Sequence, residues 1–129
     1  HQMDAAGISQ LNVLGLVACE AAYEHGEEWY QEMKAYVKEN IEFVKQYVEE
    51  QLPGVNMVEH EGTYLVWLDF RETGLSVEEL DDKIINQAKL WLDSGKIFGS
   101  CGEGFQRINV ACPRKVLEEA LERIKNAVE

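Results

Sequence analysis

The feature that most constrains the fold of this chain is that its apolar residues follow a helical spacing up to residue 52 and form β-like segments directly after it. Between residues 29 and 52 the apolar side chains recur every three or four positions, which predicts a single amphipathic helix of about 24 residues. Pro53-Gly54 then ends that helix. The segments 55–58 and 63–70 are β-like and are joined by turn-like residues, so we expect them to pair as a hairpin.

The second half of the chain alternates helices and strands. Ser76-Val77-Glu78-Glu79 has the form of a capping box and opens a helix, residues 90–92 and 105–110 are predicted strands, and Pro113 suits the first turn of a last helix. The buried stripes of these two helices are predicted at Leu80, Ile84, Ile85 and Ala88, and at Val116, Leu117, Ala120, Leu121, Ile124 and Val128. The order of elements predicts an α+β fold in one compact unit: a small mixed or antiparallel sheet covered by helices, with a long N-terminal helical region.

The N-terminal region predicts a further helix, over about residues 8–23, that is apolar on nearly every side. Gly26 interrupts it, and the acidic pair Glu27-Glu28 suits the start of the next helix. A helix that is apolar all round is normally buried, which in a chain of 129 residues indicates a missing partner surface. Because His1-Gln2-Met3-Asp4 does not resemble a natural start, we expect the chain to be a piece of a longer protein.

Composition and charge exclude several function classes. The formal net charge of −12 disfavours binding to nucleic acid or to an anionic membrane, and no apolar run approaches the roughly 18–20 residues of a membrane span. The three cysteines are widely spaced and odd in number, which favours a reducing cytoplasm over a disulfide framework. The cysteines and histidines lack metal-ligand spacing, so no metal site is predicted, and Cys101 is interpreted as an incidental thiol.

The stretch 102–114 carries the best candidate for a binding residue. Arg107 stands in an apolar strand, between a glycine-dense loop and the last helix, and a buried charge there needs a partner. Two interpretations remain open: a structural ion pair, or a clamp that holds an anionic ligand, most simply a carboxylate. The loop, residues 95–104, matches neither a phosphate loop nor a dinucleotide fingerprint, because a strand follows its last glycine. We interpret it as a flexible loop that lets backbone pass close to a neighbour.

Four segments, taken together, resemble one enzyme family. They are Asn12-Val13-Leu14-Gly15, residues 20–29 (EAAYEHGEEW), residues 61–69 (EGTYLVWLD) and residues 102–114 (GEGFQRINVACPR). The chain is similar in these segments to the C-terminal part of fold-type I pyridoxal-phosphate enzymes, the class I/II aminotransferase superfamily. Within it, the cystathionine β-lyase-like (MalY/PatB) branch is the most similar. The resemblance implies that residues 1–129 are the small domain and that the large cofactor-binding domain is absent.

The resemblance also implies roles for four residues. Arg107 matches the arginine that grips the α-carboxylate of an amino-acid substrate, and Asn109 falls on the same face of the strand by period-two alternation. Tyr64 matches a position near the pocket entrance, although its residue type alone favours core packing. Phe98 matches the loop that closes over the pocket, and Arg114 is expected to cap or pair locally. No catalytic, cofactor-binding or metal-binding residue is predicted in the chain.

The resemblance implies that the family's catalytic and cofactor-binding residues lie upstream of this chain. The lysine that forms a Schiff base with pyridoxal phosphate, and the groups that hold the cofactor, precede the segment that aligns with Ile8, and no lysine here has the required context. The resemblance therefore implies a full-length, cytoplasmic, dimeric enzyme that binds pyridoxal phosphate, and a chain that alone binds no cofactor and is inactive.

For the full-length enzyme, the resemblance favours a C–S β-lyase that acts on amino acids, with a transaminase of the same superfamily as the alternative. In either reaction Arg107 would orient the substrate by its carboxylate while the cofactor stabilises the Cα carbanion. A rival from another class is a noncatalytic α+β interaction or regulatory domain, in which Arg107 forms a structural salt bridge. The lack of a complete catalytic set in the sequence is the main support for this rival.

Overall fold

The computed structural model describes residues 12–128, and the chain divides into two compact units, residues 1–36 and 37–129. Helix α2 (Val13–His25) and the first turns of α3 (Glu27–Gln51) belong to the first unit. This differs from the single unit that the sequence indicated. No residue of α2 is buried, and the buried residues of α3 begin only at Val37.

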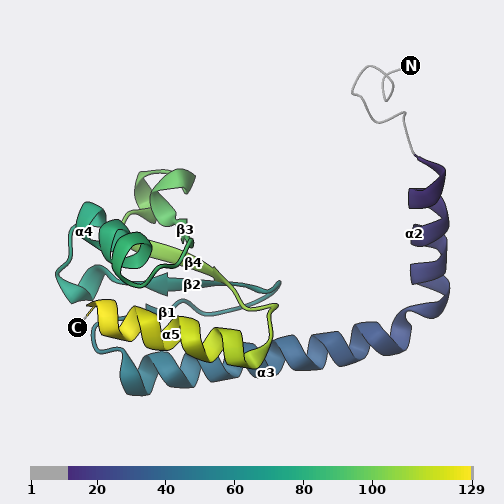
Figure 1. Ribbon diagram of the computed structural model, residues 1–129, viewed down its shortest axis with the longest axis horizontal. Coiled ribbons are helices and arrows are strands. Elements are labelled where there is room, and N and C mark those ends of the chain that lie inside the picture. The colour runs from purple at the N-terminus through teal and green to yellow at the C-terminus, as the bar shows by residue number, and fades with distance from the viewer. Residues whose placement is uncertain (1–11, 129) are drawn as a thin grey trace. The chain divides into compact units, whose positions relative to one another are not determined.

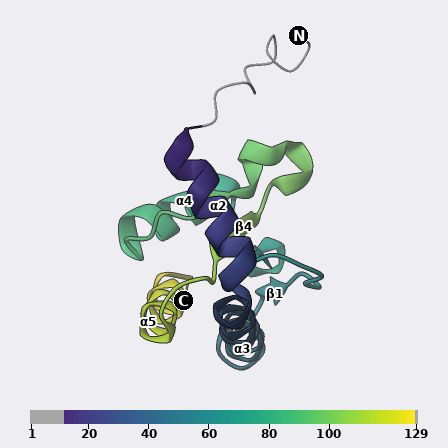
Figure 2. The same ribbon diagram turned by 90° about the vertical axis from the view of Figure 1, so that its right-hand side faces the viewer.

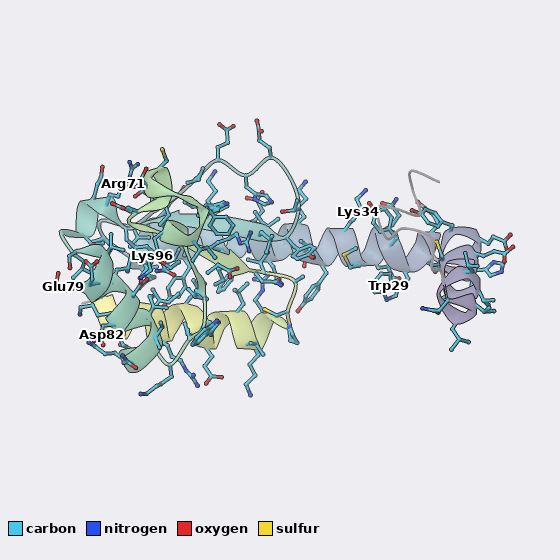
Figure 3. The ribbon with its side chains drawn as sticks, turned by 90° about the horizontal axis from the view of Figure 1, so that it is seen from above. Trp29, Lys34, Arg71, Glu79, Asp82 and Lys96 are labelled. Atoms are coloured by element: carbon cyan, nitrogen blue, oxygen red, sulfur yellow. The ribbon has the colours of Figure 1, made fainter. Side chains whose placement is uncertain are left out.

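The helix expected over about residues 8–23 is present as α2 but with later bounds, since it begins at Val13 and ends at His25. Residues 1–11 lie outside the described part of the chain. Asn12 caps α2, and its Oδ1 accepts a hydrogen bond from the backbone N–H of Gly15 at 2.6 Å. Gly26 ends α2, and α3 begins directly after it with the predicted acidic pair. The apolar side chains of α2 are exposed, with Leu14 at 82%. Trp29 and Lys34 mark the first turns of α3 in Figure 3.

The second unit contains a four-stranded antiparallel sheet. Its strands are β1 (Asn56–Met57), β2 (Leu65–Asp69), β3 (Asp93–Ser94) and β4 (Phe105–Asn109), in the order β1-β2-β4-β3. The predicted hairpin is present as β1 and β2, with Met57 opposite Leu68. The strand predicted at residues 90–92 lies slightly later. Lys89 turns the chain with a φ of 56°, and pairing with β4 starts only at Asp93.

Helices cover one face of this sheet. Alternate residues of the two central strands, Val66, Leu68, Gln106 and Ile108, are buried. Beneath them the second part of α3 and helix α5 (Arg114–Val128) lie side by side in both views (Figures 1 and 2). The helical residues buried there are Val37, Asn40, Val44 and Val48 of α3 and Leu117, Leu121, Ile124 and Ala127 of α5.

Two predicted core residues are exposed instead. Val116 of α5 is 53% exposed, because it precedes the buried stripe that begins at Leu117. Ile85 is 41% exposed, because the helix α4 (Val77–Asp82) continues as a π-helical turn, Lys83–Gln87. A π turn changes which residues share a face. The predicted capping box at the start of α4 is present, with Ser76 N–H donating to Glu79 Oε2 at 2.9 Å.

The glycine-dense segment before β4 is more regular than the predicted loop. It contains two 3₁₀ turns, Gly95–Phe98 and Ser100–Gly102. Gly95 and Gly102 pack backbone against backbone, since a Cβ added to Gly95 would lie 2.0 Å from the carbonyl oxygen of Gly102. This close approach explains both glycines. The segment lies on the side of the sheet opposite α3 and α5 (Figures 1 and 2). Among residues 12–128, no helix is long and apolar enough to cross a membrane.

Candidate functional site

The face of the sheet that α3 and α5 leave uncovered carries Arg107. In β4 the buried residues Gln106 and Ile108 alternate with Phe105, Arg107 and Asn109, which are not buried. Strand alternation therefore places Arg107 on the opposite face from the helices, where the Gly95–Gly102 segment crosses. The Arg107 side chain is 24% exposed, so its charge is only partly hydrated.

Asp93 is the partner that the Arg107 charge was expected to need. Strand β3 sets Asp93 directly opposite Arg107 in the register with β4. One carboxylate oxygen, Oδ2, accepts hydrogen bonds from Nη2 at 2.7 Å and from Nε at 3.2 Å. An ion pair, one of the two alternatives that the sequence left open, is therefore present, and a charge-assisted pair of this geometry fixes the direction of the guanidinium.

An aromatic row lies around the same guanidinium. The Phe98 ring stacks on Arg107, with the guanidinium carbon 4.7 Å from the ring centroid. Trp67 stands opposite Arg107 in the β2–β4 register and meets Phe98 edge to face at 5.1 Å and Phe105 at 6.3 Å. Arg107 therefore meets an aromatic face as well as a carboxylate, a combination that suits arginine and not lysine.

A second guanidinium flanks the other end of this row. Arg71 lies 4.6 Å from the centroid of the Phe105 ring and pairs with both oxygens of Asp69, at 2.9 and 2.7 Å. Hydrogen bonding to Arg71 holds the pKa of Asp69 below its ordinary value, although partial burial opposes this shift. Figure 3 looks onto this side of the molecule and labels Arg71 together with Lys96 of the crossing segment. Both guanidinium planes of this face are thus held by a ring and a carboxylate.

Asn109 and Tyr64 lie at the far end of the β2–β4 pair. The backbone carbonyl of Tyr64 accepts a hydrogen bond from Val110 at 2.9 Å, which places it beside the end of β4 and not beside Arg107. Its side chain is exposed. Asn109 Oδ1 accepts from the backbone N–H of Ala111 at 2.9 Å and so shapes the turn after β4. The structure groups Phe98 with Arg107 and sets Tyr64 apart from them.

Arg107 and Asn109 share one cavity. A cavity of about 340 Å³ lies at the β3 edge of the sheet, and both residues line it together with Asp93, Trp91 and Cys112. Its volume is within the range of small-molecule sites. The cysteine there is a poor nucleophile, because burial raises the pKa of the Cys112 thiol. All three cysteines are free thiols, and residues 12–128 contain no cluster of histidine, cysteine and carboxylate groups that could hold a metal ion.

A buried amide anchors the chain just after β4. Asn40 of α3 is fully buried, and its Nδ2 donates to the carbonyls of Val110 at 2.8 Å and Cys112 at 2.9 Å. Its Oδ1 accepts from Arg114 Nε at 2.8 Å, and the Arg114 guanidinium carbon lies 4.4 Å from the Phe43 ring centroid. Arg114 therefore bonds to a residue 74 positions away, not only locally as expected. This anchor fixes the end of the strand that carries Arg107.

Sequence reasoning missed Asp93, Trp67 and Asn40. Asp93 and Trp67 matter because strand pairing brings them to Arg107, and register is a long-range property. A signal was present for Asp93, since an aspartate in an apolar segment next to a strand with one arginine is a candidate ion pair. Asn40 was detectable as the polar residue on the apolar stripe of α3.

Known proteins resemble this chain in sequence and in fold. No protein-family model matches the chain. Cystathionine beta-lyase PatB of Bacillus subtilis (strain 168) is 37% identical over 122 residues, which cover 95% of this chain and 32% of PatB. Protein MalY of Escherichia coli (strain K12) is 34% identical over 122 residues, which cover 95% of this chain and 31% of MalY. A pyridoxal-phosphate-bound protein of Clostridium difficile 630 superposes with a TM-score of 0.93 at 44% identity, over 99% of this chain and 33% of that chain.

The chain belongs to the fold-type I aminotransferase superfamily, in its MalY/PatB branch. It spans about a third of the length of the curated relatives it matches, as a small domain. The small antiparallel sheet covered by helices, predicted from the order of elements, is the fold that these structures share. The resemblance of the sequence to the small domain of this superfamily is thus confirmed. The roles of four residues stay predictions: Arg107, Tyr64, Asn109 and Phe98.

Proposed function

We propose that this chain is the substrate-carboxylate-binding domain of a pyridoxal-phosphate-dependent C–S β-lyase that acts on amino acids. Residues 1–129 would form the small domain, and a large domain of the same protein would hold the cofactor. The observation that carries the proposal is the arrangement of Arg107 on the uncovered face, paired with Asp93 along one edge and without an acceptor in residues 12–128 along the other. A free pair of N–H groups on a guanidinium matches the two oxygens of a carboxylate.

We expect the cofactor to be held outside this chain, and the contacts of two of its lysines support this expectation. Lys96, whose segment crosses the uncovered face, is bound to Asp81, and that bond raises the pKa of Lys96 and keeps it charged. Lys83 donates to the carbonyl of Ala127 on the opposite side of the sheet. In the complete enzyme the cofactor, held elsewhere, would supply the electron sink for bond cleavage at Cα and Cβ. This chain would bind the carboxylate and orient the amino acid, and we expect it to be inactive alone.

Two further features of the complete protein belong to the proposal. The relatives named after lyase activity favour C–S β-elimination. A transaminase is the alternative, because carboxylate binding serves both reactions equally. We also propose a cytoplasmic homodimer; the three free thiols support a reducing compartment.

One observation favours a second candidate function. The Asp93–Arg107 pair is what a noncatalytic interaction domain with a structural salt bridge would contain. The two candidates differ in what the loss of the guanidinium changes. In a structural pair it changes stability, whereas in a clamp it changes the KM for an amino-acid substrate.

The test is Arg107→Ala in the full-length protein that carries this chain, with cofactor bound. We expect kcat/KM for L-cystathionine to fall at least tenfold, which corresponds to about 1.4 kcal/mol. Arg123→Ala is the matched control, since it removes an exposed guanidinium of α5, on the covered side of the sheet. If both variants keep wild-type kinetics, the carboxylate-binding role is wrong. A cofactor absorbance band in the isolated 129-residue chain would contradict the division of the site between two domains.

A further inference from the structure

We propose that Asp93 is a positioning residue that holds Arg107 ready for the substrate carboxylate. This inference rests on the proposed function and deepens it, because it says how the guanidinium is set in place before a substrate arrives. It rests on which N–H groups of Arg107 donate hydrogen bonds to Asp93 and which do not.

Asp93 uses only one edge of the guanidinium. An arginine side chain has five N–H groups: one on Nε and two each on Nη1 and Nη2. The Oδ2 atom of Asp93 accepts from Nε at 3.2 Å and from Nη2 at 2.7 Å, which occupies the Nε/Nη2 edge. Within residues 12–128, Nη1 has no acceptor. The Nη1/Nη2 edge therefore keeps two parallel N–H groups, which is the geometry that a carboxylate binds with two hydrogen bonds.

Two independent restraints fix the orientation of that edge. Asp93 is held by the β3–β4 register directly opposite Arg107, and β3 runs into Gly95, whose backbone packs on Gly102. The Phe98 ring covers the guanidinium plane at 4.7 Å from its centroid. The hydrogen bonds to Asp93 fix the rotation of the guanidinium within its plane, and the Phe98 ring fixes the orientation of that plane. The free edge is thus oriented by contacts that do not involve a substrate.

The pair has little value for folding alone. The Asp93 side chain is 43% exposed and that of Arg107 24%, and ion pairs of this exposure contribute little to stability. Its value lies in binding, since a long side chain that is already ordered loses less conformational entropy when it binds. The negative charge of Asp93 acts in the opposite direction, because it repels an incoming carboxylate. The direction in which KM changes when Asp93 is removed therefore distinguishes positioning of Arg107 from neutralisation of its charge.

The experiment measures KM and kcat of the full-length, cofactor-loaded protein with L-cystathionine. Asp93→Ala is expected to raise KM about tenfold and to leave kcat within about twofold, as expected when a binding group loses its orientation. Asp93→Asn should recover most of the loss, because its amide oxygen can still accept from Nε and Nη2. Combined with Arg107→Ala, the Asp93→Ala change should add nothing further. Glu119→Ala, which breaks an exposed ion pair on α5, is the control.

A second measurement needs no catalysis. In the 129-residue chain, the Arg107 Nε–H signal in NMR should exchange with solvent faster after Asp93→Ala, while thermal unfolding shows that the variant is folded. A merely structural role would not separate KM from kcat, and neutralisation alone would lower KM. If Arg107→Ala raises KM but Asp93→Ala leaves it unchanged or lowers it, positioning by Asp93 is refuted and the clamp stands. If Arg107→Ala has no effect, the proposed function itself fails.

Discussion

Replacing Asn40 by alanine tests whether the buried amide of α3 holds the end of β4. The side chain makes three hydrogen bonds, to Val110, Cys112 and Arg114, and has no exposed surface. Alanine keeps the helix of α3 but removes every one of these bonds. Two backbone carbonyls then lose their amide donor, and the Arg114 Nε–H loses this acceptor.

The expected cost follows from the three bonds. A neutral hydrogen bond contributes about 1 kcal/mol net and one to a charged group about 2 kcal/mol, and buried groups left unsatisfied add more. The sum is roughly 3–5 kcal/mol. For a unit the size of residues 37–129, 1 kcal/mol shifts Tm by about 4–8 °C, so Asn40→Ala should lower Tm by roughly 12 °C or more.

The assay is thermal unfolding of the 129-residue chain followed by circular dichroism. Asn56→Ala is the matched control, because Asn56 lies exposed on β1 and makes one long bond to Glu72 at 3.3 Å. That variant should stay within about 0.5 kcal/mol of the parent chain. Equal shifts of Tm in the two variants would refute the anchoring role of Asn40, and with it our account of how the chain after Arg107 is fixed.

Two other predictions concern the crossing segment and acid stability. In Gly102→Ala the new Cβ would lie 2.1 Å from the Gly95 carbonyl oxygen, so we expect a loss of about 1–3 kcal/mol in urea unfolding. Gly62→Ala, with no atom within 4 Å, should be near neutral, and similar losses in both would contradict the packing argument. Burial raises the pKa of Asp81, but hydrogen bonds from Lys96, Ser94 and Gln106 outweigh it and leave the pKa lowered. A carboxyl group of lowered folded-state pKa stabilises the fold above its unfolded pKa, and this contribution is lost as pH falls through the folded pKa, so Asp81→Asn should flatten the stability loss between about pH 5 and 2. An unchanged pH profile would contradict this assignment.

Most of the fold could be predicted because it depends on local patterns. The long helix ends at Gln51, two residues before the predicted stop at Pro53-Gly54, and the hairpin, the capping box and β4 occur close to where the sequence places them. Two of the errors come from irregular local backbone geometry. A π turn displaced Ile85 from the core, and a turn at Lys89 delayed β3, and neither feature leaves a periodic signal in the sequence.

The candidate site was predictable in part for the same reason. Arg107 could be found from one strand alone, because a single charge in an apolar strand is unusual. Its neighbours could not be found that way. Asp93 and Trp67 come to it through strand register, and Phe98 comes through a glycine-packed turn whose geometry depends on two backbones meeting.

The two interpretations of Arg107 that the sequence left open are not exclusive. A guanidinium has two edges of paired N–H groups, and one carboxylate oxygen of Asp93 occupies only the first. An arginine with no partner would be mobile and would have to be ordered by each substrate. An arginine bound along both edges would have no place for a ligand. The partly satisfied arrangement in this small domain reconciles the two interpretations, because the ion pair with Asp93 orients the guanidinium and the edge that has no acceptor in residues 12–128 is the one we propose for a carboxylate.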